Sequence, residues 1–296
     1  MNPILKYLGT TGKEKMAKIV STQADEHPLP DSLICHEDLS YKGQDGATLA
    51  ADVYRPIDAS ADPLPIAVFV HGGGLVVGTR KANRAYAELV AERGYVAFIP
   101  DYRFLDETDG LGEIADVCAG LSYLKAHVAE FGGDLTRILV IGESAGGFLA
   151  LYATALSSSP HLQETLGIEA PELSVRALAC FGGMIYTTGI DPIGLVYRRD
   201  MFGSRLRDAD FMDLMNPENP SIESNLPPVL QVVSGADFLK SNTLRYNEAL
   251  AMAGHDHRLI YYKKGKDLKH AFPSRYPELP QSREVLDRLD AWFKAL

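Results

Sequence analysis

A serine, an acid and a histidine each stand in a loop that follows an apolar segment of the chain. Ser144, Asp237 and His270 occur in that order, after the apolar residues 137–141, 228–233 and 258–262. A histidine can take the proton of a serine hydroxyl, and an acid can hold that histidine in the required tautomer. These residue types therefore predict a serine that attacks a carbonyl carbon, with His270 as general base.

The sequence around the serine, residues 142–146 (GESAG), has the G-x-S-x-G spacing of a sharp turn between a strand and a helix. Small residues on both sides avoid clashes there, so that the serine hydroxyl stands clear of the sheet. The N–H of Ala145, at the start of the expected helix, would point at the oxyanion of a tetrahedral intermediate. We assign Glu143 no catalytic role and expect it to form hydrogen bonds beneath the serine.

Further oxyanion donors are expected from residues 71–74 (HGGG), which follow the apolar residues 66–70. Glycine lets backbone N–H groups face a ligand without a Cβ in the way. We predict Gly73 and Gly74 as donors and His71 as a residue that holds the loop. The chain has neither G-x-G-x-x-G nor Gly-Lys-Ser/Thr, which argues against a nucleotide loop.

The acid and the histidine both have rivals. Asp237 directly follows an apolar segment and is favoured, with Asp267, three residues before His270, as the main alternative. His255 and His257 precede the last expected strand and so belong to its amino end. Since sites in parallel sheets form at the carboxyl ends of strands, His270 is favoured.

The elements that must position these residues alternate along the chain. We predict a hairpin over residues 34–54, further strands at 66–70, 95–99, 137–141, 175–181, 228–233 and 258–262, and helices at 81–93, 111–131, from 144, 241–253 and 281–295. Strands that alternate with helices indicate βαβ units. The fold class is therefore α/β, with a mostly parallel central sheet flanked by helices.

Two segments interrupt this alternation and predict a small helical cap. Residues 1–33 suit one or two amphipathic helices, and residues 182–226 form an insertion in a catalytic domain that spans residues 34–296. The insertion is rich in methionine and aromatic residues. We predict that some of them line the substrate pocket, namely Met184, Tyr186, Met201, Phe202 and Phe211.

The composition excludes several classes of protein. The 296 residues are 46% hydrophobic and 23% charged, typical of a folded globular chain. The net charge of −10 disfavours nucleic acid as a partner, and no apolar run is long enough to span a membrane. The three cysteines form neither a disulfide framework nor a metal pair, and the N-terminus lacks a signal-peptide core. We expect a cytoplasmic protein without metal or cofactor, and the sequence leaves a homodimer open.

Together, the segments HGGG (71–74), GESAGG (142–147), SGADFL around Asp237 and KHAF at His270 resemble the hormone-sensitive-lipase-like branch of the α/β-hydrolases. The likeness runs over residues 35–296, and DYRF at 101–104 resembles the DYR stretch of that branch. It implies an α/β-hydrolase fold and the same nucleophile, partners and oxyanion donors. Glu143 stands where this branch more often has aspartate, and FLDE follows where it has LAPE.

The predicted function is hydrolysis of small carboxylic esters through an acyl-enzyme. The small cap indicates short acyl groups, from acetyl to butyryl, or small aromatic acids. Two alternatives stay open. The same residues could cleave a small amide or peptide, and the same fold could serve as a ligand receptor without catalysis.

Overall fold

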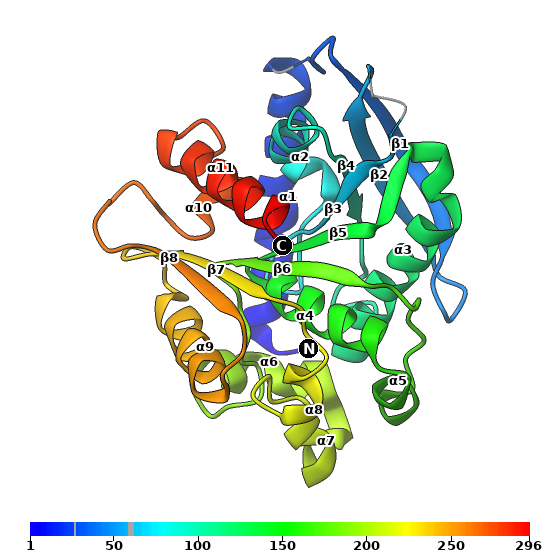
Figure 1. Cartoon of the computed structure of the whole chain (residues 1–296). Helices are drawn as coiled ribbons and strands as arrows, with labels where there is room; N and C mark the ends of the chain where they lie inside the picture. Colours follow the sequence, from blue (N-terminus) through cyan, green and yellow to red (C-terminus); the bar gives the residue numbers. More distant parts are fainter. Residues whose placement is uncertain (27, 59–61) are drawn as a thin grey trace.

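An eight-stranded sheet forms the centre of the computed structural model, which describes residues 1–26, 28–58 and 62–296 (Figure 1). The strand order across the sheet is β1-β2-β4-β3-β5-β6-β7-β8. β1 and β2 form an antiparallel hairpin, and β2 pairs antiparallel with β4. The remaining neighbours are parallel. The predicted α/β class with a mostly parallel sheet is confirmed. The strands are β1 (Leu33–Lys42), β2 (Thr48–Pro56), β3 (Leu64–Val70), β4 (Val96–Pro100), β5 (Gly133–Glu143), β6 (Val175–Phe181), β7 (Val229–Ser234) and β8 (His257–Tyr262).

Both faces of the central strands β3, β4, β6 and β7 are buried, and these strands are apolar on both sides. In β3, Ile66 and Val68 pack into one core and Ala67 and Phe69 into the other. α3 and α4 cover the first face, with α9 at its edge, and α2 and α11 cover the second (Figure 1). The bounds of these and the smaller helices are η1 (Arg80–Asn83), α2 (Arg84–Ala91), α3 (Gly110–Phe131), α4 (Ala145–Ser158), α5 (Pro160–Leu166), α9 (Lys240–Ala253), α10 (Phe272–Arg275) and α11 (Pro280–Lys294).

The insertion, residues 182–226, folds into short helices. They are α6 (Pro192–Phe202), η2 (Gly203–Arg207), α7 (Ala209–Leu214) and α8 (Pro220–Glu223). Asp191, Asp208 and Asn219 each accept a hydrogen bond from backbone N–H groups at a helix start, which satisfies donors that a helix cannot pair internally. The frequent caps explain why this segment forms several short helices.

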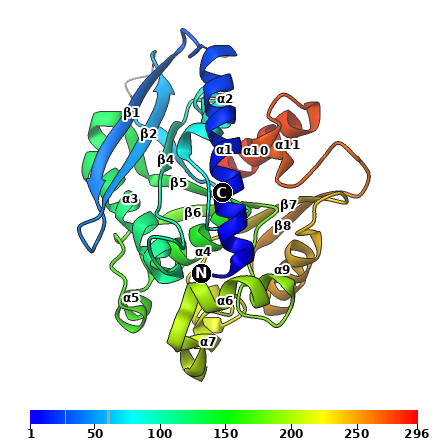
Figure 2. The ribbon, with the colours of Figure 1, turned by 180° about the vertical axis from the view of Figure 1, so that it is seen from behind.

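The N-terminal segment forms one long helix, α1 (Pro3–Glu26), which runs past α6 and η1 on the outside of the molecule (Figure 2). The buried Leu5 packs into the core, and the Asn2 N–H donates to the carboxylate of Asp200 on α6. Gly9 and Gly12 face Val76 and Val77 of the loop after β3. Across residues 1–26, 28–58 and 62–296, none of the helices combines the length and apolarity that a bilayer span requires.

Candidate active site

Ser144 occupies the turn between β5 and α4 in a backbone conformation that non-glycine residues rarely adopt. Its φ is 53° and its ψ is −119°. A Cβ on Gly146 would lie 2.2 Å from the carbonyl oxygen of Val70, and one on Gly142 would lie 2.6 Å from that of Gly146. Gly146 is therefore needed for the turn to fit against β3, and Gly142 for β5 to fit against the start of α4. The strain is retained because the surrounding backbone leaves no room to relax.

The structure joins Ser144, His270 and Asp237 in one chain of hydrogen bonds. The His270 Nε2 lies 2.8 Å from the Ser144 Oγ, and the His270 Nδ1 lies 2.8 Å from the Asp237 Oδ1. An ionised carboxylate only accepts, so Nδ1 carries the proton and Nε2 can accept the hydroxyl proton of Ser144. The side chains predicted from three separate loops thus meet at the carboxyl edge of the sheet.

Asp237 is held as a carboxylate. Burial raises its pKa, but the hydrogen bond and charge of His270 and two backbone N–H donors outweigh burial and lower it. The donors are Leu239, at 2.8 Å from Oδ1, and Ala271, at 3.0 Å from Oδ2. The rival acid Asp267 is not the partner, because Asp237 occupies the Nδ1 side of the His270 ring.

The rival histidines lie at the amino end of β8, as expected from their order in the chain. His255 donates from Nε2 to the carbonyl oxygen of Pro227 at 2.9 Å, and His257 donates from Nδ1 to that of His255 at 2.8 Å. Both rings therefore bond to the backbone at the end of the sheet opposite Ser144.

The glycine loop after β3 lies next to the serine turn. A Cβ on Gly72 would stand 3.0 Å from the Cβ of Ser144, and one on Gly73 would stand 1.5 Å from the carbonyl oxygen of Val77. Gly73 and Gly74 have φ values of 134° and 62°. Within the described part of the chain, the N–H groups of Gly73, Gly74 and Ala145 donate to no protein acceptor. These three donors remain free for a ligand oxygen.

His71 and its neighbours fix the glycine loop. The His71 ring stacks on Tyr102 with centroids 4.4 Å apart, and the Tyr102 hydroxyl donates to the His71 carbonyl oxygen at 2.9 Å. Asp101, at 3.5 Å from the His71 Nε2, is also bonded by Arg80. Arg80 in turn bonds the buried Asp52 of β2. The sequence predicts that His71 holds the loop, but Arg80 and Asp52 could not be predicted as its support, because they lie outside the motifs and far apart along the chain.

A second buried cluster lies beneath the serine. The Glu143 carboxylate accepts hydrogen bonds from Asn83 at 2.8 Å, the Ser274 hydroxyl at 2.8 Å and the Arg275 guanidinium at 2.6 Å. Burial raises the Glu143 pKa, but Arg275 and these hydrogen bonds outweigh burial and lower it. Because Ser274 and Arg275 lie just after His270, this carboxylate ties the serine turn to the loop that carries the histidine.

The five residues predicted to line the substrate pocket are all buried. The N–H of Met184 donates to the Ser144 carbonyl oxygen at 2.7 Å, and Tyr186 lines a cavity beside the histidine. Met201, Phe202 and Phe211 belong to the same hydrophobic core cluster as Met184 and Tyr186. The Phe202 ring contacts the rings of Phe148 on α4 and of Phe211 on α7. Short helices such as α6 and α7 are stabilised mainly by packing of this kind. That Met201, Phe202 and Phe211 line the substrate pocket stays a prediction.

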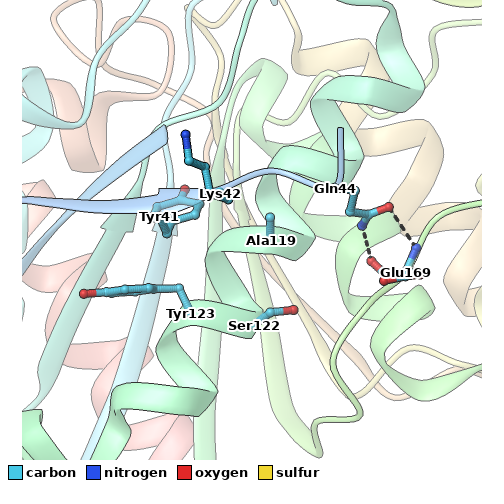
Figure 3. Close-up of a pocket in the computed structure, with 7 residues that line it drawn as sticks. All are labelled: Tyr41, Lys42, Gln44, Ala119, Ser122, Tyr123 and Glu169. Atoms are coloured by element: carbon cyan, nitrogen blue, oxygen red, sulfur yellow. Dashed lines mark hydrogen bonds between the residues drawn. The ribbon is translucent and has the colours of Figure 1, made fainter. Parts of the chain in front are cut away.

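Two cavities lie close to the three catalytic candidates. One of about 370 Å³ is lined by Tyr186, Ile193 and Phe238, and one of about 330 Å³ by Gly72, Glu143 and Arg275 among others. A third, of about 390 Å³, lies between β1 and α3, where the side chain of Gln44 bonds the backbone of Glu169 (Figure 3). None of the three linings includes Ser144, Asp237 or His270, but the first two include their chain neighbours Phe238 and Glu143.

Comparisons with known proteins identify relatives. The model of the BD-FAE family matches residues 51–239. Esterase LipC of Mycobacterium tuberculosis is 38% identical over 138 residues, which cover 46% of this chain and 34% of LipC. The match therefore spans about a third of that relative. Esterase LipI of the same organism is 25% identical over 280 residues, which cover 85% of this chain and 79% of LipI.

Solved structures share the fold. Esterase B from Lactobacillus rhamnosis superposes with a TM-score of 0.86 at 21% identity, covering 99% of this chain and 95% of that one. A bacterial heroin esterase superposes with a TM-score of 0.73 at 23% identity, covering 94% and 89%. At these low sequence identities, the structural similarity shows that the α/β fold is shared.

Proposed function

Because the chain belongs to the BD-FAE family, within the hormone-sensitive-lipase-like branch of the α/β-hydrolases, we propose that it is a serine carboxylesterase. The observation that carries this proposal is the hydrogen-bond chain from Ser144 through His270 to Asp237, with both distances at 2.8 Å. The free N–H groups beside the serine support it. The substrate is a small ester, and the chain's own residues supply every step.

The proposed reaction has two halves. His270 takes the hydroxyl proton as the Ser144 Oγ attacks the ester carbonyl carbon, and the negative oxygen accepts hydrogen bonds from the N–H groups of Gly73, Gly74 and Ala145. The protonated Nε2 then gives its proton to the departing alcohol oxygen, which leaves an acyl group on Ser144. In the second half, His270 removes a proton from water, the water attacks the acyl carbon, and Ser144 recovers its proton.

Asp237 acts through His270. Its carboxylate holds the Nδ1 proton and so keeps Nε2 free to accept, and it stabilises the imidazolium that forms in both halves. Because Asp237 is itself fixed by the N–H groups of Leu239 and Ala271, the imidazole orientation follows from the backbone.

For the acyl part we propose acetyl to butyryl groups or a small aromatic acid. Residues 1–33 and 182–226 would act as the cap over the site. Met201, Phe202 and Phe211 of the insertion are buried in the core, and the insertion consists of short helices. Each further methylene gains at most about 0.8 kcal/mol on burial, and that gain ends where the acyl chain meets a wall.

The serine mechanism is tested with a fluorophosphonate probe and p-nitrophenyl acetate. The wild-type protein should be labelled once and hydrolyse the ester, whereas Ser144→Ala should lose the label and turnover by roughly 10⁴-fold or more. Ser158→Ala, on the same helix and exposed, is the control and should behave as wild type. A folded Ser144→Ala protein with near-wild-type turnover would contradict the mechanism.

The acyl preference is tested separately on p-nitrophenyl acetate, butyrate, octanoate and palmitate. We expect kcat/KM to be greatest at acetate or butyrate. A maximum at octanoate or longer would show that the site holds a deep acyl channel, and the size argument would then be wrong.

A further inference from the structure

An exposed aromatic ring covers one face of His270. The Phe238 ring lies 4.1 Å from the His270 ring between centroids, at 42° between planes, and Phe238 is 76% exposed. Binding of an apolar ligand that covers exposed apolar surface is favourable, because it removes that surface from water. This ring is therefore a surface on which a substrate group can rest while it is beside the histidine.

The backbone fixes the position of Phe238. It follows Asp237 directly, and the next two residues both bond to Asp237. Leu239 donates to the Oδ1 at 2.8 Å, and Lys240 donates to the backbone oxygen at 3.1 Å. The same carboxylate that orients His270 therefore also holds the turn that presents Phe238.

A cavity of about 370 Å³ opens beside this ring. Its walls are mostly apolar or aromatic and include Tyr186, Pro192, Ile193, Phe238 and Leu239. The Tyr186 ring is held by its hydroxyl, which donates to Glu218 at 2.6 Å, and by the Arg245 guanidinium, 3.8 Å from the ring centroid. Arg245 is itself paired with Glu218 at 2.9 Å, so its charge does not require an anionic ligand.

The strand order indicates which part of a bound ester would reach this cavity. Along the carboxyl edge of the sheet, β3 carries the glycine loop, β5 carries Ser144, and β7 and β8 carry Asp237 and His270 beyond β6. The carbonyl oxygen of the ester must face the glycine loop. The departing oxygen must reach the His270 Nε2 to receive its proton, so the alcohol part extends toward β7 and β8. The cavity begins at the turn after β7.

We propose that this cavity binds the alcohol part of the ester and that Phe238 makes the protein selective for alcohols that carry an aromatic ring. The inference rests on the proposed esterase function. An aromatic ring of the alcohol would lie against Phe238 and between Tyr186 and Ile193. An aromatic contact of this kind corresponds to about threefold to tenfold in kcat/KM.

The experiment varies one part of the ester at a time. Benzyl acetate and ethyl acetate share the acyl group and differ in the alcohol, whereas ethyl acetate and ethyl butyrate share the alcohol. Each is measured with the wild type, Phe238→Ala, Phe238→Tyr and Met252→Ala. Met252 is exposed at the far end of α9 and serves as the control. Titration with a fluorophosphonate gives the fraction of active sites in each preparation.

In Phe238→Ala we expect the ratio of kcat/KM for benzyl acetate over ethyl acetate to fall about threefold to tenfold. Phe238→Tyr should restore that ratio, and Met252→Ala should leave it unchanged. An equal loss on all esters would mean that Phe238 only supports His270, and a change confined to the butyrate-to-acetate ratio would place the acyl group in the cavity. Either result would overturn the inference. A wild-type protein that neither reacts with the probe nor hydrolyses any ester would overturn the proposed function, and this inference with it.

Discussion

Glu143→Gln removes the charge at the centre of the buried cluster while it keeps the shape of the side chain. The carboxylate accepts from Asn83, Ser274 and Arg275. A glutamine amide has one oxygen, and its nitrogen only donates. In either amide orientation, therefore, the N–H of Asn83 or of Arg275 faces another donor.

The magnitude follows from this geometry. A hydrogen bond to a charged group contributes about 1.5–3 kcal/mol, and breaking a fully buried ion pair costs about 3–5 kcal/mol. Glu143 is 2% exposed, but the Arg275 side chain is 40% exposed and can regain water. We therefore expect a loss of about 2 kcal/mol in the free energy of unfolding, in the lower part of the range for a hydrogen bond to a charged group. Unfolding in urea, followed by circular dichroism at pH 7, measures it.

The pH dependence gives an independent check. The lowered pKa of Glu143 means that its stabilisation is complete above the ordinary carboxyl pKa of 4.5 and is lost as the pH falls through the lower pKa of the folded state. The difference between wild type and Glu143→Gln should thus be constant from pH 6 to 8 and shrink in acid. Glu284→Gln is the control, because Glu284 is 53% exposed and pairs with Arg288 at 3.6 Å. It should change stability by less than about 1 kcal/mol. Equal losses in the two variants at pH 7 would refute the reasoning.

Four further variants test the proposed site. Gly73→Ala should abolish most ester hydrolysis, since its Cβ would stand 1.5 Å from the Val77 oxygen and force the loop to move, and wild-type kcat would contradict this. Asp237→Asn should lower kcat by about 10⁴-fold through the wrong imidazole tautomer, as measured on p-nitrophenyl acetate. His270→Ala should be nearly inactive and His257→Ala active in the same assay, and the reverse pattern would disprove the assignment of the base.

Much of the site could be predicted from the order of the strands and of the residues that follow them. The strand that ends at Glu143 could be recognised because parallel strands buried on both faces are apolar throughout. The glycines around Ser144 mark a turn that no larger residue fits. The rule that functional residues follow strands then separated His270 from His257, and the structure places the two at opposite ends of β8.

Other features could not be read from the sequence. Met201 and Phe202 belong to an apolar stripe that looks the same in the sequence whether it lines a pocket or fills a core, and the packing of Phe202 on Phe148 of α4 comes from a distant part of the chain. The partners of Glu143 come from distant positions, with Asn83 and Arg275 separated from it by 60 and 132 residues. A polar side chain gives no local sign of which distant donors it will meet.

The two glycines of α1 that face the glycine loop make the helix and the loop depend on each other. A Cβ on Gly12 would lie 2.8 Å from the Val77 side chain, and one on Gly9 would lie 3.2 Å from the Val76 carbonyl oxygen, so the helix packs closely on the loop at both glycines. Each weakens an isolated helix by about 1 kcal/mol relative to alanine. The helix is therefore stabilised by its packing on the loop, and the backbone of α1 covers residues 76 and 77 of that loop. Since local opening follows packed units, separation of α1 would remove the packing that holds residues 76 and 77, directly after the oxyanion glycines.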